Sequence, residues 1–198
     1  MRYPKNLQIL IDKLSLLPAV GPKTAERYAF YLLKQKEDDL KGLAETISNL
    51  KSSIKTCRNC LAISESDPCG ICSDDKRNNQ ILCVVENIQD MIVIEKTEQY
   101  QGKYFILGGL ISMIDEIGPE KLNIKKLVDI INKNKVKELI IALNFTLEGE
   151  TTSMYLNKIF KNKIKLTRLA KGLPAGSDLE YADHTTLKSA LKYRSELK

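Results

Sequence analysis

Four cysteines have the spacing of a metal site. Cys57 and Cys60 form one C-x-x-C pair, Cys69 and Cys72 form a second, and eight residues separate the two pairs. Two tight turns with this spacing can offer four thiolates tetrahedrally to one Zn2+. Disulfide bonds are the alternative, but no export signal is apparent, so we expect reduced thiols. Because four thiolates leave no position open for water, the sequence predicts a structural zinc site.

The segment that carries these cysteines needs the metal in order to fold. From residue 57 to residue 79 apolar periodicity disappears, and polar residues, Pro and Gly dominate. So little apolar surface cannot form a core, and the binding energy of zinc then becomes folding energy. Cys83, the fifth cysteine, lies inside an apolar run and is expected to be a buried core thiol.

A basic turn lies between two amphipathic helical patterns near the start of the chain. Gly21 precedes Pro22, a residue well suited to open a helix, so free backbone N–H groups there could bind a phosphate. Lys23 and Arg27 share one face of that helix. The stretch resembles the helix-hairpin-helix motif, although Ala19 stands where the motif usually has glycine. A plain helical hairpin used for packing or dimerisation is the alternative.

Acidic residues follow two of the predicted strands. Glu86 ends the first strand, Asp90 comes four residues later, and Glu148 and Glu150 follow a later strand. The carboxyl ends of parallel strands converge on one rim of a sheet, so these side chains could form an acidic cleft that holds Mg2+. This order resembles the Toprim domain, with Glu-x-Glu in place of Asp-x-Asp. Acidic residues are also common at loop starts without any such role.

The periodicity of apolar residues predicts an α/β protein built from several modules. Residues 7–54 have helical periodicity throughout. After residue 80, apolar strand-like runs alternate with helical patterns, which favours a parallel sheet covered on both faces. The predicted strands are Ile81–Val85, Tyr104–Leu107, Glu138–Leu143 and Ile164–Leu169, and the predicted helices are Ile88–Glu95, Pro119–Asn132, Thr151–Phe160 and Asp183–Tyr193.

Composition limits the chemistry without defining it. The chain has 198 residues and a net charge of +6, which suits a polyanionic partner, but a solvated lysine surface has the same charge. A single histidine, His184, excludes mechanisms that need two. No apolar run is long enough to cross a membrane, and we expect a cytoplasmic protein. The glycines of residues 171–177 do not have the spacing of a P-loop.

Taken together, these segments resemble the RecR family of bacterial recombination mediators over the whole chain. The departures are Ala19, Leu110, Met113 and His184. The resemblance rests on the four cysteines and on the following segments: Leu17-Pro-Ala-Val-Gly-Pro-Lys23, Leu107-Gly-Gly-Leu-Ile-Ser112, Ile117-Gly-Pro119, Thr146-Leu-Glu-Gly-Glu150, Leu169-Ala-Lys-Gly-Leu-Pro174 and Gly176-Ser-Asp-Leu-Glu-Tyr-Ala-Asp183.

The resemblance implies a domain order and a function. We expect a helix-hairpin-helix DNA-binding region in residues 1–55, a four-cysteine zinc module in 56–79, a Toprim-like α/β domain in 80–175, and a C-terminal segment in 176–198 that completes this domain or an oligomer interface. Members of this family, with RecO and in some settings RecF, help to load RecA onto single-stranded gaps without known catalysis. They also form dimers or ring-shaped tetramers around DNA.

The same resemblance implies roles for particular residues. Gly21, Lys23 and Arg27 match the hairpin that binds single- and double-stranded DNA without reading its sequence. Glu86, Asp90, Glu148 and Glu150 form a surface that docks a basic partner or holds Mg2+. Two other functions stay open, namely a Mg2+-dependent Toprim nuclease and an oligomerisation adaptor that never contacts DNA.

Overall fold

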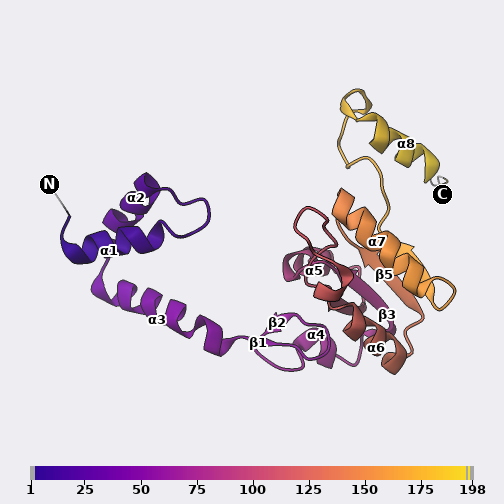
Figure 1. Ribbon diagram of the computed structural model, residues 1–198, viewed down its shortest axis with the longest axis horizontal. Helices are drawn as coiled ribbons and strands as arrows, with labels where there is room; N and C mark the ends of the chain where they lie inside the picture. Colours follow the sequence, from indigo (N-terminus) through magenta and orange to yellow (C-terminus); the bar gives the residue numbers. More distant parts are fainter. Residues whose placement is uncertain (1–2, 195, 197–198) are drawn as a thin grey trace. The chain divides into compact units, whose positions relative to one another are not determined.

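The computed structural model describes residues 3–194 and residue 196, and the chain divides into two compact units, Met1–Ile54 and Lys55–Lys198 (Figure 1). The first unit contains three helices, α1 (Lys5–Leu14), α2 (Pro22–Leu33) and α3 (Glu37–Ser53), as the helical periodicity predicts.

A small core joins the first two helices of this unit. Ile11 on α1 packs against Ala25 and Ala29 on α2, and all three are buried. Alanines at this contact let the two helices approach closely. Helix α3 buries no residue within the described part of the unit, and Leu43 and Ile47 on it are exposed.

The second unit begins with the cysteine segment. Strands β1 (Lys55–Thr56) and β2 (Ile63–Ser64) pair antiparallel, and the short helix α4 (Gly70–Ser73) follows. The two short strands enclose the first cysteine pair, and α4 contains the end of the second.

A four-stranded parallel sheet forms the centre of the second unit, with strand order β4-β3-β5-β6. Its two central strands, β3 and β5, are labelled in Figure 1. The strands are β3 (Asn78–Val85), β4 (Gly102–Ile106), β5 (Glu138–Ala142) and β6 (Lys165–Arg168). The parallel arrangement confirms the prediction from the apolar runs. Because β3 and β5 are central, the residues that follow them reach the same rim of the sheet.

Alternation along the central strand β3 divides the core into two clusters. Leu82 and Val84 point to one face of the sheet, where α6 (Ile124–Asn134) and α7 (Leu147–Phe160) cover it. Successive side chains of a strand point to opposite faces, so their neighbours belong to the other cluster.

The other face of the sheet packs against the cysteine segment. Cys83 and Val85 lie in one buried cluster with Cys57, Cys60 and Cys69. Met91 from α5 (Ile88–Glu95) completes this cluster. The cysteine segment is therefore part of the core of the α/β unit rather than a separately packed module.

Two predicted helices begin at other residues in the structure. The pattern predicted from Pro119 is a short 3-10 helix, Pro119–Lys121, and α6 starts only at Ile124. The interruption has a clear cause, because Asn123 is pinned to the end of β4 by donating from both its backbone N and its side-chain Nδ2 to the carbonyl of Leu107. Helix α7 starts at Leu147 because the hydroxyl of Thr146 accepts from the N–H of Gly149 and caps the first turn.

The chain ends in a 3-10 helix, Leu179–Tyr181, and helix α8, His184–Lys192. Asp183 caps α8 by accepting from the N–H groups of Thr185 and Thr186, which agrees with the predicted start of this helix. Across the described residues, no helix has the length and apolar character needed to cross a membrane.

Candidate metal site and nucleic-acid interface

The structure gathers the four predicted cysteines into one cluster. The sulfur atoms of Cys57, Cys60, Cys69 and Cys72 all lie within 4.8 Å of one another, and the first three residues are buried. A zinc ion with four Zn–S bonds of about 2.3 Å requires sulfurs about 3.8 Å apart. The Sγ atoms of Cys60 and Cys69 are 3.5 Å apart, and all four thiols are free rather than paired as disulfides. The cluster therefore has the composition and spacing of a tetrahedral thiolate site.

Short local hydrogen bonds present these sulfurs. The N–H of Cys57 donates to the carbonyl of Ala62 at 2.8 Å, and the N–H of Leu61 donates back to the carbonyl of Cys57 at 3.0 Å, which closes the first knuckle. The N–H of Cys69 points at the sulfur of Cys57, 3.4 Å away, and joins the two knuckles. Backbone N–H groups that point at thiolates stabilise their negative charge.

The thiols influence one another's ionisation. A hydrogen bond from Cys72, followed by weaker ones from the backbone of Ala62 and from the other thiols, lowers the pKa of Cys60 to about 6 despite its burial. Burial raises the pKa of Cys69 to about 11, and the hydrogen bond to Cys60 together with burial raises the pKa of Cys72. The pKa of Cys60 is therefore lowered, whereas the pKa values of Cys69 and Cys72 are raised. A bound divalent cation is what would let four thiolates coexist.

The fifth cysteine behaves differently. Cys83 is 2% exposed in β3, and burial raises its pKa to about 12. Such a thiol stays protonated, so Cys83 is the core residue that the sequence predicts.

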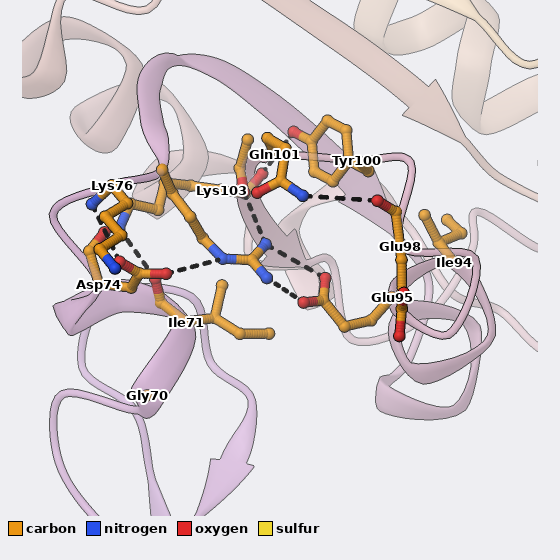
Figure 2. Close-up of polar contacts among 12 residues, drawn as sticks. Gly70, Ile71, Asp74, Lys76, Ile94, Glu95, Glu98, Tyr100, Gln101 and Lys103 are labelled. Carbon is orange, nitrogen blue, oxygen red and sulfur yellow. Dashed lines mark hydrogen bonds and ion pairs between the residues drawn. The ribbon is translucent and has the colours of Figure 1, made fainter.

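Polar contacts fasten the cysteine segment to the sheet. The N–H of Ile106 in β4 donates to the carbonyl of Cys60 at 2.8 Å. Arg77 lies between the two structures: its guanidinium pairs with Glu95 on α5, donates to the carbonyl of Gly102 at 3.2 Å, and lies 3.7 Å from Asp74 just after α4. Figure 2 shows Asp74 and Glu95 on opposite sides of this guanidinium. Sequence patterns gave no signal for Arg77, because its partners on α5 and β4 are distant in sequence.

Two of the predicted acidic residues lie near the end of β3. Asn144, at the end of β5, donates from Nδ2 to Glu86 Oε2 at 3.2 Å, so the carboxyl ends of the two central strands meet as expected. Asp90 lies in the first turn of α5, where its N–H donates to the side chain of Asn87. A negative charge is favourable at this end of a helix.

Glu86 also borders a pocket of about 270 Å³ beside the cysteine segment. Its lining includes Leu61 and Ile63 from the cysteine segment, Ile106 at the end of β4, and Gly108 just beyond it. The pocket thus combines an apolar wall with a carboxylate.

Glu150, by contrast, is neutralised by two cations. Arg168 makes a bidentate pair with its carboxylate at 2.7 and 2.9 Å, and Lys171 Nζ lies 2.6 Å from it. These hydrogen bonds lower the pKa of Glu150 to about 2, with Arg168 contributing most. Both cations also lie over the ring of Phe145, at 4.5 and 4.6 Å from its centroid. The charge of Glu150 is therefore already balanced within the chain.

The position between the two glutamates, Gly149, leaves no room for a side chain. A Cβ at this position would lie 1.9 Å from the backbone oxygen of Asn144, far inside van der Waals contact. The close approach lets α7 begin directly against the end of β5, with Glu148 and Glu150 in its first turn.

The structure divides the predicted acidic residues rather than placing them around one ion. Glu86 and Glu150 border different pockets. Within the part of the chain that the structure describes, the four cysteines are the one group of three or more potential ligands close enough to share a metal ion.

In the helical unit, the turn before α2 has an unusual backbone. Ala19 adopts a left-handed conformation, with φ of +61°, at the position where the helix-hairpin-helix motif usually has glycine. Gly21 precedes α2 with extended backbone, and Pro22 is the first helical residue. No side chain of the described residues caps α2, so its first N–H groups are open to a ligand such as a phosphate. Ala19 thus adopts the backbone conformation that glycine would adopt, and its Cβ makes that conformation strained.

The basic residues of this hairpin are accessible. Lys23 and Arg27 lie one turn apart on α2, and neither takes part in an ion pair within the described chain. The guanidinium of Arg27 lies 6.0 Å from the ring centroid of Tyr28. Leu16 and Leu17, in the turn itself, are exposed as well. As far as the described residues show, the hairpin therefore presents two unpaired cations beside an uncapped helix N-terminus.

The same unit contains an apolar groove of about 410 Å³ between α3 and the other two helices. Its walls are leucine-rich and include Leu7, Leu10, Leu14, Leu32, Leu40 and Leu43.

The C-terminal helix borders a basic cleft of about 640 Å³. Its lining includes Lys171, and it includes Lys188, Lys192 and Tyr193 on α8 or just after it. His184 is the first residue of α8 and is exposed.

Comparisons with known proteins cover both units. Three family models match the chain: a RecR helix-hairpin-helix over residues 7–51, a Toprim domain over 80–170, and a RecR C-terminal region over 172–195. The chain is 47% identical over 198 residues to the recombination protein RecR of Staphylococcus haemolyticus, with both chains covered in full. It is 48% identical over 195 residues to the RecR of Gloeothece citriformis, with 98% of each chain covered. The RecR of Staphylococcus aureus is 46% identical over the full length of both chains.

Proposed function

The chain belongs to the RecR family of recombination proteins, and from this premise we propose that it binds DNA without reading sequence and acts as a non-catalytic mediator of recombinational repair. In this role it helps RecO, and in some settings RecF, to load RecA onto single-stranded gaps. The observation that carries the proposal is the hairpin at the start of α2. The N–H groups that follow Gly21 have no side-chain cap there, and Lys23 and Arg27 make no ion pair with any described residue. Because this role requires access to DNA, the proposal includes a cytoplasmic location, at the nucleoid during repair.

Sequence-blind binding follows from the chemistry of this hairpin. Phosphates are the same at every nucleotide, and contacts from lysine, arginine and backbone N–H groups to phosphates carry no base information. A few such contacts per chain are weak, but several copies acting together can hold single- or double-stranded DNA firmly. We therefore include a homodimer or ring-shaped homotetramer in the proposal, and the leucine-lined groove of the helical unit is a surface that such an assembly could bury.

We assign one structural Zn2+ per chain to Cys57, Cys60, Cys69 and Cys72. The metal supplies folding energy to a segment with little apolar surface, and its closed thiolate shell leaves no position for a substrate. The cysteine residues then keep the first knuckle against β4 through the Cys60 carbonyl.

The acidic residues of the α/β unit are proposed to dock a basic partner such as RecO. Glu86, Asp90 and Glu148 are the members whose charge is not paired with a cation among the described residues. Glu150 contributes less net charge because Arg168 and Lys171 already neutralise it. Mg2+ at this rim remains a ligand to test rather than a requirement of the mechanism.

A loading assay tests the proposed role. RecA assembly is followed on gapped DNA coated with single-strand-binding protein, with RecO present, and with or without this protein. We expect the protein to accelerate assembly, and the Lys23→Ala, Arg27→Ala double variant to lose most of that effect. The matched control is Lys34→Ala, Lys36→Ala, which removes the same charge from residues beyond the other end of α2. Equal loading by both double variants would contradict the role of the hairpin.

The match to the Toprim domain favours one alternative, a Mg2+-dependent nuclease. Such an enzyme would have to bring Glu86, Glu148 and Glu150 around the metal. Among the described residues these three carboxylates do not lie close enough to share an ion. Incubation with Mg2+ or Mn2+ and end-labelled DNA or RNA separates the two functions. We expect the substrate to stay intact at all metal concentrations. Cleavage by the unmodified protein that is lost in Glu86→Ala would instead show that the protein is a nuclease.

A further inference from the structure

A buried lysine links the second cysteine knuckle to the edge of the sheet. Lys103 lies in β4 and is only 8% exposed. Its Nζ donates to the carbonyls of Ile71 at 2.8 Å and Asp74 at 2.7 Å (Figure 2). It also donates to the carbonyl of Cys72 at 3.2 Å. All three acceptors lie within or just after α4, in the second knuckle and the residues that follow it.

This geometry matches what a buried ammonium group requires. An ammonium has three donors and no acceptor, and burying it without partners is very unfavourable. The three carbonyls supply one acceptor for each donor, and they lie at the C-terminal end of a helical turn, where a positive charge is favoured. The same three hydrogen bonds therefore satisfy the buried ammonium group and fix the position of the second knuckle.

Metal charge adds a second attraction. One Zn2+ on four thiolates would carry a net charge of −2, which the positive charge of Lys103 would partly offset. The first knuckle is joined to the same strand through the hydrogen bond from Ile106 N to the Cys60 carbonyl. Strand β4 therefore contacts both knuckles, through a backbone N–H at one and an ammonium at the other.

We propose that Lys103 is a positioning residue for the metal site and that it couples zinc retention to the order of strand β4. When zinc leaves, the carbonyls of residues 71–74 are no longer held together, and the ammonium loses its acceptors. When Lys103 is absent, the second knuckle loses its anchor and releases zinc faster. This inference rests on the proposed zinc occupancy.

Chemical labelling of lysines tests the coupling in the unmodified chain. Zinc-loaded and chelator-treated proteins are acetylated at the same pH, and each lysine is quantified by mass spectrometry. Lys76 is the internal control, because it is exposed and lies in the same segment. With zinc bound, Lys103 should react at least about tenfold more slowly than Lys76, and zinc removal should abolish most of this protection. Equal reactivity of the two lysines with zinc bound, or protection that persists without zinc, would overturn the proposal.

Zinc release provides the second test. Outer-shell changes typically alter metal affinity about 10- to 100-fold, so Lys103→Met should release zinc to a chromophoric chelator at least about tenfold faster than the unmodified protein. Lys76→Met removes the same charge from the same segment and should stay within about twofold of it. Release from Lys103→Met at the unmodified rate would refute the positioning role, and the labelling experiment decides the question if this variant does not fold.

The zinc content of the purified protein is measured before either test. A chain without zinc would refute the metal assignment itself. A zinc-loaded chain with a reactive Lys103 would refute only the coupling through this residue.

Discussion

Ala19→Gly should stabilise the helical unit. The alanine has φ of +61°, and a left-handed backbone costs a residue with a Cβ about 1–2 kcal/mol. Glycine removes this penalty but loses about 0.4–1 kcal/mol through its greater freedom in the unfolded chain. The net gain is about 0.5–1 kcal/mol, which corresponds to a rise in melting temperature of about 4 °C for a unit of this size. Removal of the methyl group should also let a phosphate approach the turn more closely and so raise DNA affinity.

Ala44→Gly is the matched control, since it makes the same chemical change at an exposed position inside α3. In a helix this change should destabilise by about 0.5–1 kcal/mol, the opposite sign. Hydrogen exchange of peptides from α1, α2 and α3, measured across a urea series, gives the free energy of opening for each variant. A loss of stability in Ala19→Gly, equal to that in the control, would refute the strain argument.

Three further predictions concern the α/β unit. Cys60→Ala should lose one equivalent of zinc by elemental analysis and accelerate hydrogen exchange in residues 57–72, and full zinc retention would refute the four-cysteine site. Glu150→Gln should lose stability above about pH 4.5 and much less near pH 2, because Arg168 and Lys171 hold the pKa of Glu150 at about 2, below its ordinary value of 4.5. The difference in urea midpoint between this variant and the parent, measured from about pH 6 to about pH 2.5, tests the claim, and a constant difference would contradict it. Gly149→Ala should lower the free energy of unfolding by at least about 2 kcal/mol, since the added Cβ would overlap the backbone of Asn144. A change below about 0.5 kcal/mol in urea unfolding would contradict this steric argument.

The sequence was most informative where chemistry fixes the spacing of residues. Two C-x-x-C pairs predict one cluster because four sulfurs must meet one ion, and the structure places them within 4.8 Å. Continuous apolar runs predict a buried parallel sheet, and all four strands are found with boundaries shifted by at most three residues. Helix starts were less accurate, because the pinning of Asn123 by Leu107 depends on a contact between distant segments.

Long-range pairing explains what the sequence did not reveal. The pattern Glu-Gly-Glu indicates an acidic site, but whether Glu150 is free depends on Arg168, which reaches it only after β6 joins the sheet. Lys103 has no local signal either, since its acceptors lie 29 to 32 residues earlier in the chain. Ala19 was recognisable as a departure from the glycine of the motif, but its left-handed backbone is a property of the folded turn.

The salt dependence of DNA binding tests the central claim most directly. Affinity for two unrelated duplexes is measured from about 50 to 200 mM salt for the unmodified protein and for the Lys23→Ala, Arg27→Ala variant. We expect equal affinity for the two sequences. We also expect the slope of log affinity against log salt to become shallower in the variant, by about 0.9 for each phosphate that the two side chains no longer neutralise. Strong preference for one sequence, or an unchanged slope and affinity in the variant, would contradict sequence-independent binding through this hairpin.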